Sequence, residues 1–204
     1  IATALGVFLG VMSGVKRGTL VDQIGMVFSV IGVSVPEFWL GLNLILLFGV
    51  TWHVLPIGGY VSLSDGWLAN FRTLLLPSLS LGLTQSAFIA RMVRSSVLEV
   101  MDQDYVRTAR AKGMPQRRVI LKHVLKNAMV PTVTVVGMTF SVLVGGAIAI
   151  ETVFNLPGIG KLLMNAILRR DYPLIQGIVL YISFAYIIVN LLMDILYVYI
   201  DPRI

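Results

Sequence analysis

The residues best suited to chemistry are the basic side chains between positions 91 and 126. Nine arginines and lysines in this block outnumber three acidic residues (Arg91, Arg94, Arg107, Arg110, Lys112, Arg117, Arg118, Lys122 and Lys126 against Glu99, Asp102 and Asp104). Guanidinium and ammonium groups form strong charge-assisted hydrogen bonds with acceptors on a partner. The length and helical pattern of the block predict a docking surface for a partner.

Two carboxylates stand out because they lie in or beside apolar runs. Glu37 follows Pro36 inside one run, and Glu151 ends another. An ionisable group inside a membrane is a functional candidate by default. The simpler interpretations are a carboxylate that is paired or near water at a proline kink for Glu37, and a helix-end carboxylate in water for Glu151.

Other chemistry finds little support. The phosphate-binding pattern GxxxxGK[ST] is absent, so we expect no ATP hydrolysis by this chain. It has no cysteine, and His53 and His123 fall in different loops, so the sequence predicts no metal site and no cofactor.

The elements that position these residues are membrane helices. Of the 204 residues, 57% are hydrophobic and 13% charged, with a mean hydropathy of +0.88. A soluble domain carries about 25% charged residues, so the composition predicts an all-α integral membrane protein, a polytopic helical bundle. The net charge of +6 is concentrated in loops, which favours the positive-inside bias over nucleic-acid binding.

A spanning helix needs about 20 mainly apolar residues. Five segments are predicted to span, at 1–15, 24–50, 74–89, 130–150 and 173–197. The chain starts inside a hydrophobic run, so we expect a missing upstream helix and six spans in all. Charge places Lys16, Arg17 and the basic block on the cytoplasmic side, and residues 53–72 and 151–171 outside. Pro157 and Gly158 predict a turn in the second outer segment, before a short amphipathic helix over 162–168.

The basic block itself predicts two helices joined at a glycine. Asp102 or Asp104 can cap a helix over 104–112, and Gly113 can end it in a left-handed conformation. Pro115 suits the first turn of a second helix through 129, with Val119, Ile120, Val124 and Leu125 on its apolar side. A solvated connector that only maintains topology is the alternative.

A resemblance favours the docking surface. The strings RTARAKG (107–113), LKH (121–123) and NAMVP (127–131) resemble the EAA loop of ABC importer permeases, in the version of the dipeptide/oligopeptide/nickel permease family. Arg107-Thr108-Ala109 stands where the broader pattern has Glu-Ala-Ala. Further similar strings follow in the family's order (LPSLSLG at 76–82, Gly145-Gly146, Glu151, Phe154, Pro157-Gly158, Gly160, RDYP at 170–173 and Asp201-Pro202-Arg203).

The resemblance implies a type I ABC importer-like transmembrane domain over 1–204, N-terminally incomplete, with a cytoplasmic coupling loop over 94–129. Expected partners are a second homologous permease, two ATP-binding subunits that hold ATP and Mg, and an extracytoplasmic solute-binding protein. The coupling residues would be Arg107, Thr108, Ala109, Arg110, Ala111, Lys112 and Gly113. Candidates for the pathway or gate are Glu37, Glu151, Phe154, Pro157, Gly158 and Gly160.

The function implied is import of dipeptides or oligopeptides, by a pore-forming subunit that is not an enzyme. Nickel or another small solute is the alternative within the family. A secondary transporter would show inverted repeats and several intramembrane charges, and only 34–37 hints at this. A membrane enzyme would need convergent catalytic groups at one face, which the sequence does not contain.

Overall fold

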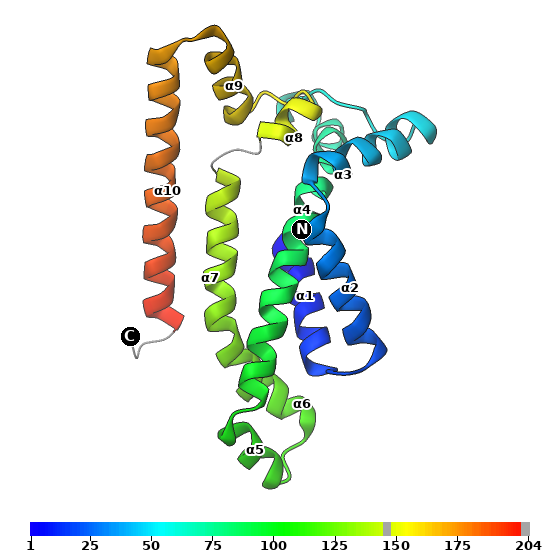
Figure 1. Cartoon of the computed structure of the whole chain (residues 1–204), viewed down its shortest axis with the longest axis vertical. Coiled ribbons are helices and arrows are strands. Elements are labelled where there is room, and N and C mark those ends of the chain that lie inside the picture. Colours follow the sequence, from blue (N-terminus) through cyan, green and yellow to red (C-terminus); the bar gives the residue numbers. More distant parts are fainter. Residues whose placement is uncertain (145–147, 201–204) are drawn as a thin grey trace. The chain divides into compact units, whose positions relative to one another are not determined.

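The computed structural model describes residues 1–144 and 148–200, with the side chains of Val144 and 196–200 excepted, and every regular element in these ranges is helical (Figure 1). Gly145, Gly146 and the Asp201-Pro202-Arg203 tail, which contribute to the sequence resemblance, lie outside the described residues. The chain divides into two units, which are described in turn.

Unit 1 comprises Ile1–Ser34, Gln85–Thr139 and Leu191–Ile204. Its helices α1 (Ala2–Val15) and α2 (Leu20–Ser34) form a hairpin that packs beside the second half of α4 (Trp67–Met101). The chain continues through α5 (Asp104–Ala111), α6 (Gln116–Val119) and a π-helical turn, η3 (Ile120–Val124), into α7 (Leu125–Val144). Figure 1 shows α5 and α6 just beyond the end of α4.

Three glycines of α1 form the contact with α4. A Cβ atom built on Gly6 would lie 2.6 Å from the Ile89 Cβ, and one on Gly10 would lie 2.6 Å from the Val93 Cβ. Gly14 meets Val97 in the same way, at 2.7 Å. Small residues four positions apart let helix backbones approach closely in a membrane. This glycine ladder therefore fixes the hairpin directly on the α4 backbone.

Unit 2 comprises Val35–Thr84 and Phe140–Asn190. It contains α3 (Glu37–Leu44), the π-helical turn η1 (Ile45–Thr51), the 3-10 turn η2 (Leu63–Asp65) and the first half of α4. It also contains α8 (Ile148–Val153), α9 (Ile159–Arg169) and most of α10 (Tyr172–Ile200). Its buried core joins Ile45, Leu76, Ile150 and Phe154.

The prediction of spanning helices is confirmed in part. Among the described residues, three helices are long and apolar enough to cross a membrane: Trp67–Met101, Gln116–Leu143 and Tyr172–Ile195. The pair Leu20–Ser34 and Glu37–Thr51, broken at Val35 and Pro36 as the sequence predicted, is a fourth candidate if it crosses as one span. The 14 residues of α1 reach about 21 Å, less than the hydrocarbon thickness of about 30 Å.

The helix that contains the third predicted span, 74–89, extends beyond it at both ends. The helix starts at Trp67, inside the expected outer loop, and continues through Pro77 to Met101. Membrane helices tolerate an internal proline because hydroxyl groups and local adjustments satisfy the freed backbone groups. Asn70 also holds the preceding loop, since its side-chain amide donates to the Val61 carbonyl oxygen at 2.6 Å.

Candidate functional site

The candidate docking surface is an elbow made by α5 and α6, which we define as residues 104–119. As predicted, Gly113 ends α5 with a φ of +75°. Its N–H donates to the Arg110 carbonyl oxygen (2.9 Å), and the Met114 N–H donates to the Ala109 carbonyl oxygen (3.3 Å). This is the Schellman pattern, in which a left-handed residue satisfies the last carbonyls of a helix. The sharp turn therefore depends on Gly113.

The start of α5 differs from the prediction. No side chain caps it, and Gln103 occupies the capping position. Asp102 is turned instead toward Arg17, 3.5 Å away, and Asp104 is already the first helical residue, 3.7 Å from Arg107. The Asp104 carboxylate still favours the helix through its place in the first turn.

The two faces of α5 have opposite character. Val106 and Ala109 are buried in the core of unit 1, where they join α4 and α6 residues. Arg107, Thr108, Arg110, Ala111 and Lys112 are exposed on the other face. The expectation that the small Ala109 side chain faces a partner needs correction, because it is only 7% exposed and its size serves packing within the chain. Ala111 is the exposed alanine.

The elbow continues directly into α7. Val119 and Val124 are fully buried, and Ile120 and Leu125 are half-buried, so the predicted apolar side is confirmed. Pro115 precedes the helix at its N-cap position, and its carbonyl oxygen accepts the Arg118 N–H at 2.9 Å. Through this apolar side the elbow is attached to the long helices of unit 1.

A hollow of about 600 Å³, with polar and apolar lining in equal measure, lies beside the elbow. Its lining includes Glu99, Gln103, Tyr105, His123 and Asn127, from α4, the start of α5, η3 and α7. The Asn127 amide donates to the Tyr105 hydroxyl at 2.9 Å. This cluster was not predicted from the sequence, because its members come together only when α5 folds back onto α7.

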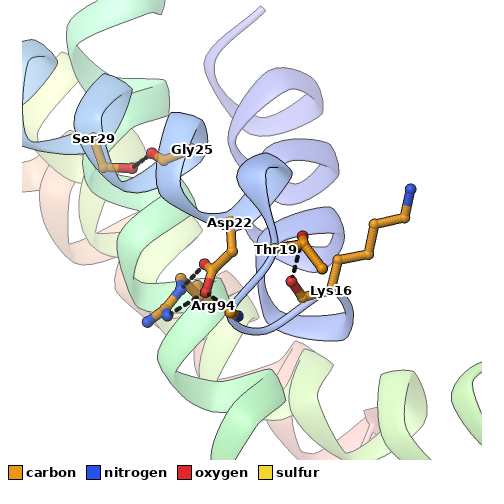
Figure 2. A network of polar contacts seen from close by, with 7 residues as sticks. Lys16, Thr19, Asp22, Gly25, Ser29 and Arg94 are labelled. Atoms are coloured by element: carbon orange, nitrogen blue, oxygen red, sulfur yellow. Dashed lines mark hydrogen bonds and ion pairs between the residues drawn. The ribbon is translucent and has the colours of Figure 1, made fainter.

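A buried ion pair ties the hairpin to α4, and its acidic member was not predicted from the sequence. The Arg94 guanidinium donates twice to the Asp22 carboxylate, from Nε at 2.6 Å and from Nη2 at 2.9 Å (Figure 2). The Gly18 N–H donates to the same carboxylate at 3.0 Å. Only 7% of the Asp22 side chain is exposed. The sequence did contain a signal for this pair: Asp22 is the one acidic residue in the apolar run 20–34, and a buried carboxylate needs a partner.

The outer candidates gather around the turn between α8 and α9. Asn155 follows α8 with a φ of +52°, and the Glu151 carbonyl oxygen accepts the Leu156 N–H at 2.8 Å. The exposed Pro157 and then Gly158 follow, and α9 begins at Ile159. The predicted turn is confirmed, and the helix expected over 162–168 is longer at its start.

Glu151 caps α9. Its carboxylate accepts the Lys161 N–H at 2.7 Å, at the third residue of the helix. A Cβ on Gly158 would collide with this carboxylate, and one on Gly160 would lie 3.0 Å from its Oε2 atom. An anion at a helix N-terminus satisfies free N–H groups and the helix dipole. The structure thus gives Glu151, Gly158 and Gly160 a structural role in this turn.

We expect Glu151→Ala to destabilise the start of α9 by about 1 kcal/mol, because a helix loses an N-terminal acceptor of that typical strength. Hydrogen exchange measured by mass spectrometry should show faster exchange of the amides at 159–162. Asn165→Ala, an exposed change on the same helix, is the control. Unchanged exchange in Glu151→Ala would show that the cap does not hold the helix.

The two remaining candidates differ in their surroundings. Phe154 is 1% exposed and packs in the core of unit 2, where its carbonyl oxygen accepts the Gly59 N–H at 2.8 Å. It is therefore a core residue within this chain. Glu37 is the first residue of α3 and is half-buried, and among the described residues it forms no ion pair. The interpretation of Glu37 as a paired carboxylate is not supported within this chain.

Known proteins resemble this chain along its whole length. A putative peptide transport system permease protein of Brucella suis and a probable peptide ABC transporter permease protein of Sinorhizobium fredii are each 45% identical to it over 204 residues. The dipeptide transport system permease protein of Escherichia coli K12 is 44% identical over 226 residues. Each alignment covers 100% of this chain, which spans 65% of the Brucella protein and 67% of the Escherichia coli protein.

The model of one protein family matches residues 6–204, described as the binding-protein-dependent transport system inner membrane component. The match includes the elbow, the glycine ladder, the α8–α9 turn and the apolar helices. The chain therefore belongs to this family of inner membrane transport components, and is a multi-pass protein of that membrane.

Proposed function

We propose that this chain is the pore-forming permease part of an ATP-driven ABC importer for dipeptides or oligopeptides. The observation that carries the proposal is the two-faced elbow, whose apolar side joins the long helices and whose basic side is exposed. A partner that binds the basic side can move the helices attached to the apolar side. Family membership and the names of the similar proteins support the same function.

The proposed machine needs other subunits. Two ATP-binding subunits hold ATP and Mg and dock on the coupling loop at 94–129, while this chain holds no cofactor and hydrolyses nothing. The contact face comprises Arg107, Thr108, Arg110, Ala111 and Lys112, and Gly113 sets its angle. A second homologous permease completes the path, and an extracytoplasmic binding protein delivers the solute. Closure of the ATP-binding pair then moves the helices in a hinge-type transition.

The proposed topology has five crossings in this chain, at α1, α2 with α3 and η1, α4, α7 and α10. The elbow, Lys16 and Arg17 then lie in the cytoplasm, in agreement with the positive-inside bias. The α8–α9 turn lies on the opposite side, where Pro157 and the exposed face of α9 meet the binding protein or act as a gate. With an upstream helix, the bundle has the six spans expected of a type I importer.

The names of the similar proteins favour peptides as the solute. Nickel or another small solute is the alternative, although the described residues contain no cluster of three possible metal ligands. Uptake of a radiolabelled dipeptide into membrane vesicles, compared with uptake of radioactive Ni²⁺, separates the two.

The contact face is tested by Ala111→Trp and Arg110→Glu. Both side chains are exposed, so we expect the permease itself to stay folded. A bulky residue at a close contact costs about 1–3 kcal/mol, and the charge reversal removes a basic hydrogen-bond donor. Co-purification of the ATP-binding subunits and ATP-dependent dipeptide uptake should both fall.

Arg72→Glu is the matched control, since it reverses an exposed arginine at the other end of α4 and should leave ATPase association unchanged. Ala109→Trp is unsuitable, because it would disrupt the core of unit 1. Normal association and uptake in both elbow variants would refute the docking role and leave the basic block as a topology signal.

A further inference from the structure

Helix α10 carries a narrow polar stripe along nearly its whole length. Its non-aromatic polar residues within 172–195 are Gln176, Ser183, Asn190 and Asp194. At 100° per residue these four, with Tyr172, fall within an arc of about 40°. No apolar residue of this range falls in that arc. The remaining positions are apolar except for Tyr181 and Tyr186.

The stripe has no partner within the part of the chain that the structure describes. Gln176, Ser183 and Asp194 are exposed, Asn190 is half-exposed, and none of their side chains forms a described hydrogen bond or ion pair. The packed face of α10 lies elsewhere on the helix, about 120° around the axis. There Ile178 is buried, and Ile175, Ile182, Ala185 and Val189 are half-buried. The stripe therefore lies away from the packed face of α10.

Hydrocarbon cannot surround such a stripe at low free energy. The helix over 172–195 is long and apolar enough to cross a membrane, and an 18-residue stretch of it has a mean hydropathy of 2.1. Amides, hydroxyls and carboxylates without hydrogen bonds are costly in lipid, and in spans they face water-filled cavities or the protein interior. From Gln176 to Asp194 the stripe extends about 27 Å at 1.5 Å per residue, which nearly matches the hydrocarbon thickness.

We propose that this stripe lines the water-filled path through which the solute crosses, and that it offers hydrogen bonds to a peptide at successive depths. The inference deepens the proposed function and rests on it. The amides of Gln176 and Asn190 both donate and accept, which suits the peptide backbone. The Asp194 carboxylate suits an ammonium group. Because the stripe has one polar residue in each turn or two, contact with the peptide can pass from one depth to the next.

The flanks of the stripe favour a water-filled path over a contact with another helix. Leu180, Ile187 and Leu191 lie beside it and are 71%, 62% and 58% exposed. Helices that hydrogen-bond to one another in membranes approach closely through small residues, as α1 and α4 do in this chain. Large side chains on this flank hold a neighbouring backbone away and leave room for water.

Single cysteines test the path, since these 204 residues contain none. Ser183→Cys and Asn190→Cys place thiols in the stripe. Tyr181→Cys and Leu192→Cys place thiols at similar depths on the far side of the helix, where the native side chains are 59% and 54% exposed. The full-length protein, assembled with its partners in membrane vesicles, is treated with methanethiosulfonate ethylsulfonate. Water favours the reactive thiolate, so the stripe thiols should react roughly tenfold faster or more.

The outcomes separate this inference from the function on which it rests. Faster reaction in the stripe, slowed by alanyl-alanine during ATP hydrolysis, supports the path. Equal, slow reaction at all four sites with intact ATP-dependent uptake would refute the proposal that the stripe lines the path, while the proposed importer function would still hold. Unreactive stripe thiols that cross-link to the second permease overturn the path in favour of a subunit contact. If the stripe thiols react quickly but no ATP-binding subunit associates with the protein, the stripe is still in contact with water, and the proposed importer function is refuted.

Discussion

Asp22→Ala is expected to destabilise the protein far more than the loss of any exposed charge. It removes both acceptors of the Arg94 guanidinium and the acceptor of the Gly18 N–H, and leaves a cation that is only 22% exposed. Removing one member of a buried ion pair costs about 3–5 kcal/mol. The midpoint of thermal unfolding of the full-length protein in mild detergent should fall accordingly.

Two further variants show whether the effect comes from the unpaired charge. Asp22→Leu combined with Arg94→Leu removes both charges and should recover much of the lost stability, as apolar replacements of buried pairs commonly do. Asp102→Ala breaks the pair with Arg17, whose members are 64% and 65% exposed, and should change stability by less than about 1 kcal/mol. Equal losses of stability in Asp22→Ala and Asp102→Ala would contradict the assignment of Asp22 and Arg94 as a stabilising buried ion pair.

Gly10→Val should separate α1 from α4. The new Cβ would lie 2.6 Å from both the Ala90 carbonyl oxygen and the Val93 Cβ, and neither is the flexible end of a side chain. Overpacking of this kind costs about 1–3 kcal/mol and sometimes more. The α1–α2 hairpin would then no longer pack against α4. Limited proteolysis of the purified protein should detect this change as faster cleavage in the loop 16–19.

Gly177→Val is the matched control for this change. It makes the same substitution in the long α10 helix, where no atom lies within 4 Å of the new Cβ. The control should resist proteolysis as the unchanged protein does. Equal resistance in Gly10→Val would show that the glycine ladder is not a close contact.

Local signals in the sequence predicted the elbow well. Gly113 and Pro115 act through the backbone of their immediate neighbours, and the apolar spacing of Val119 and Val124 follows from one helix. The same holds for the break at Pro36 and the turn at Pro157-Gly158. The direction of Ala109 was harder to predict, because a small residue fits equally well against a partner or in a core.

Features that depend on distant segments were not predicted. Asp22 and Arg94 meet across 72 positions, and Asn127 meets Tyr105 only through the fold of the elbow. Glu151 was predicted to be a pathway residue. Its role as a hydrogen-bond acceptor at the start of α9 depends on how α9 returns toward α8, which the sequence does not reveal. The glycines of α1 and the polar stripe of α10 were visible as spacings of four and seven residues, but each needed the surrounding contacts to distinguish packing from exposure.

The ion pair between Asp22 and Arg94 also has a consequence for biogenesis. The acid is synthesised 72 residues before its partner, and at about 5–20 residues per second the ribosome needs roughly 4–14 seconds to reach Arg94. During this interval the newly made hairpin has neither its counter-ion nor the α4 surface that its glycines fit. The hairpin can therefore reach its final packing only after α4 has been synthesised.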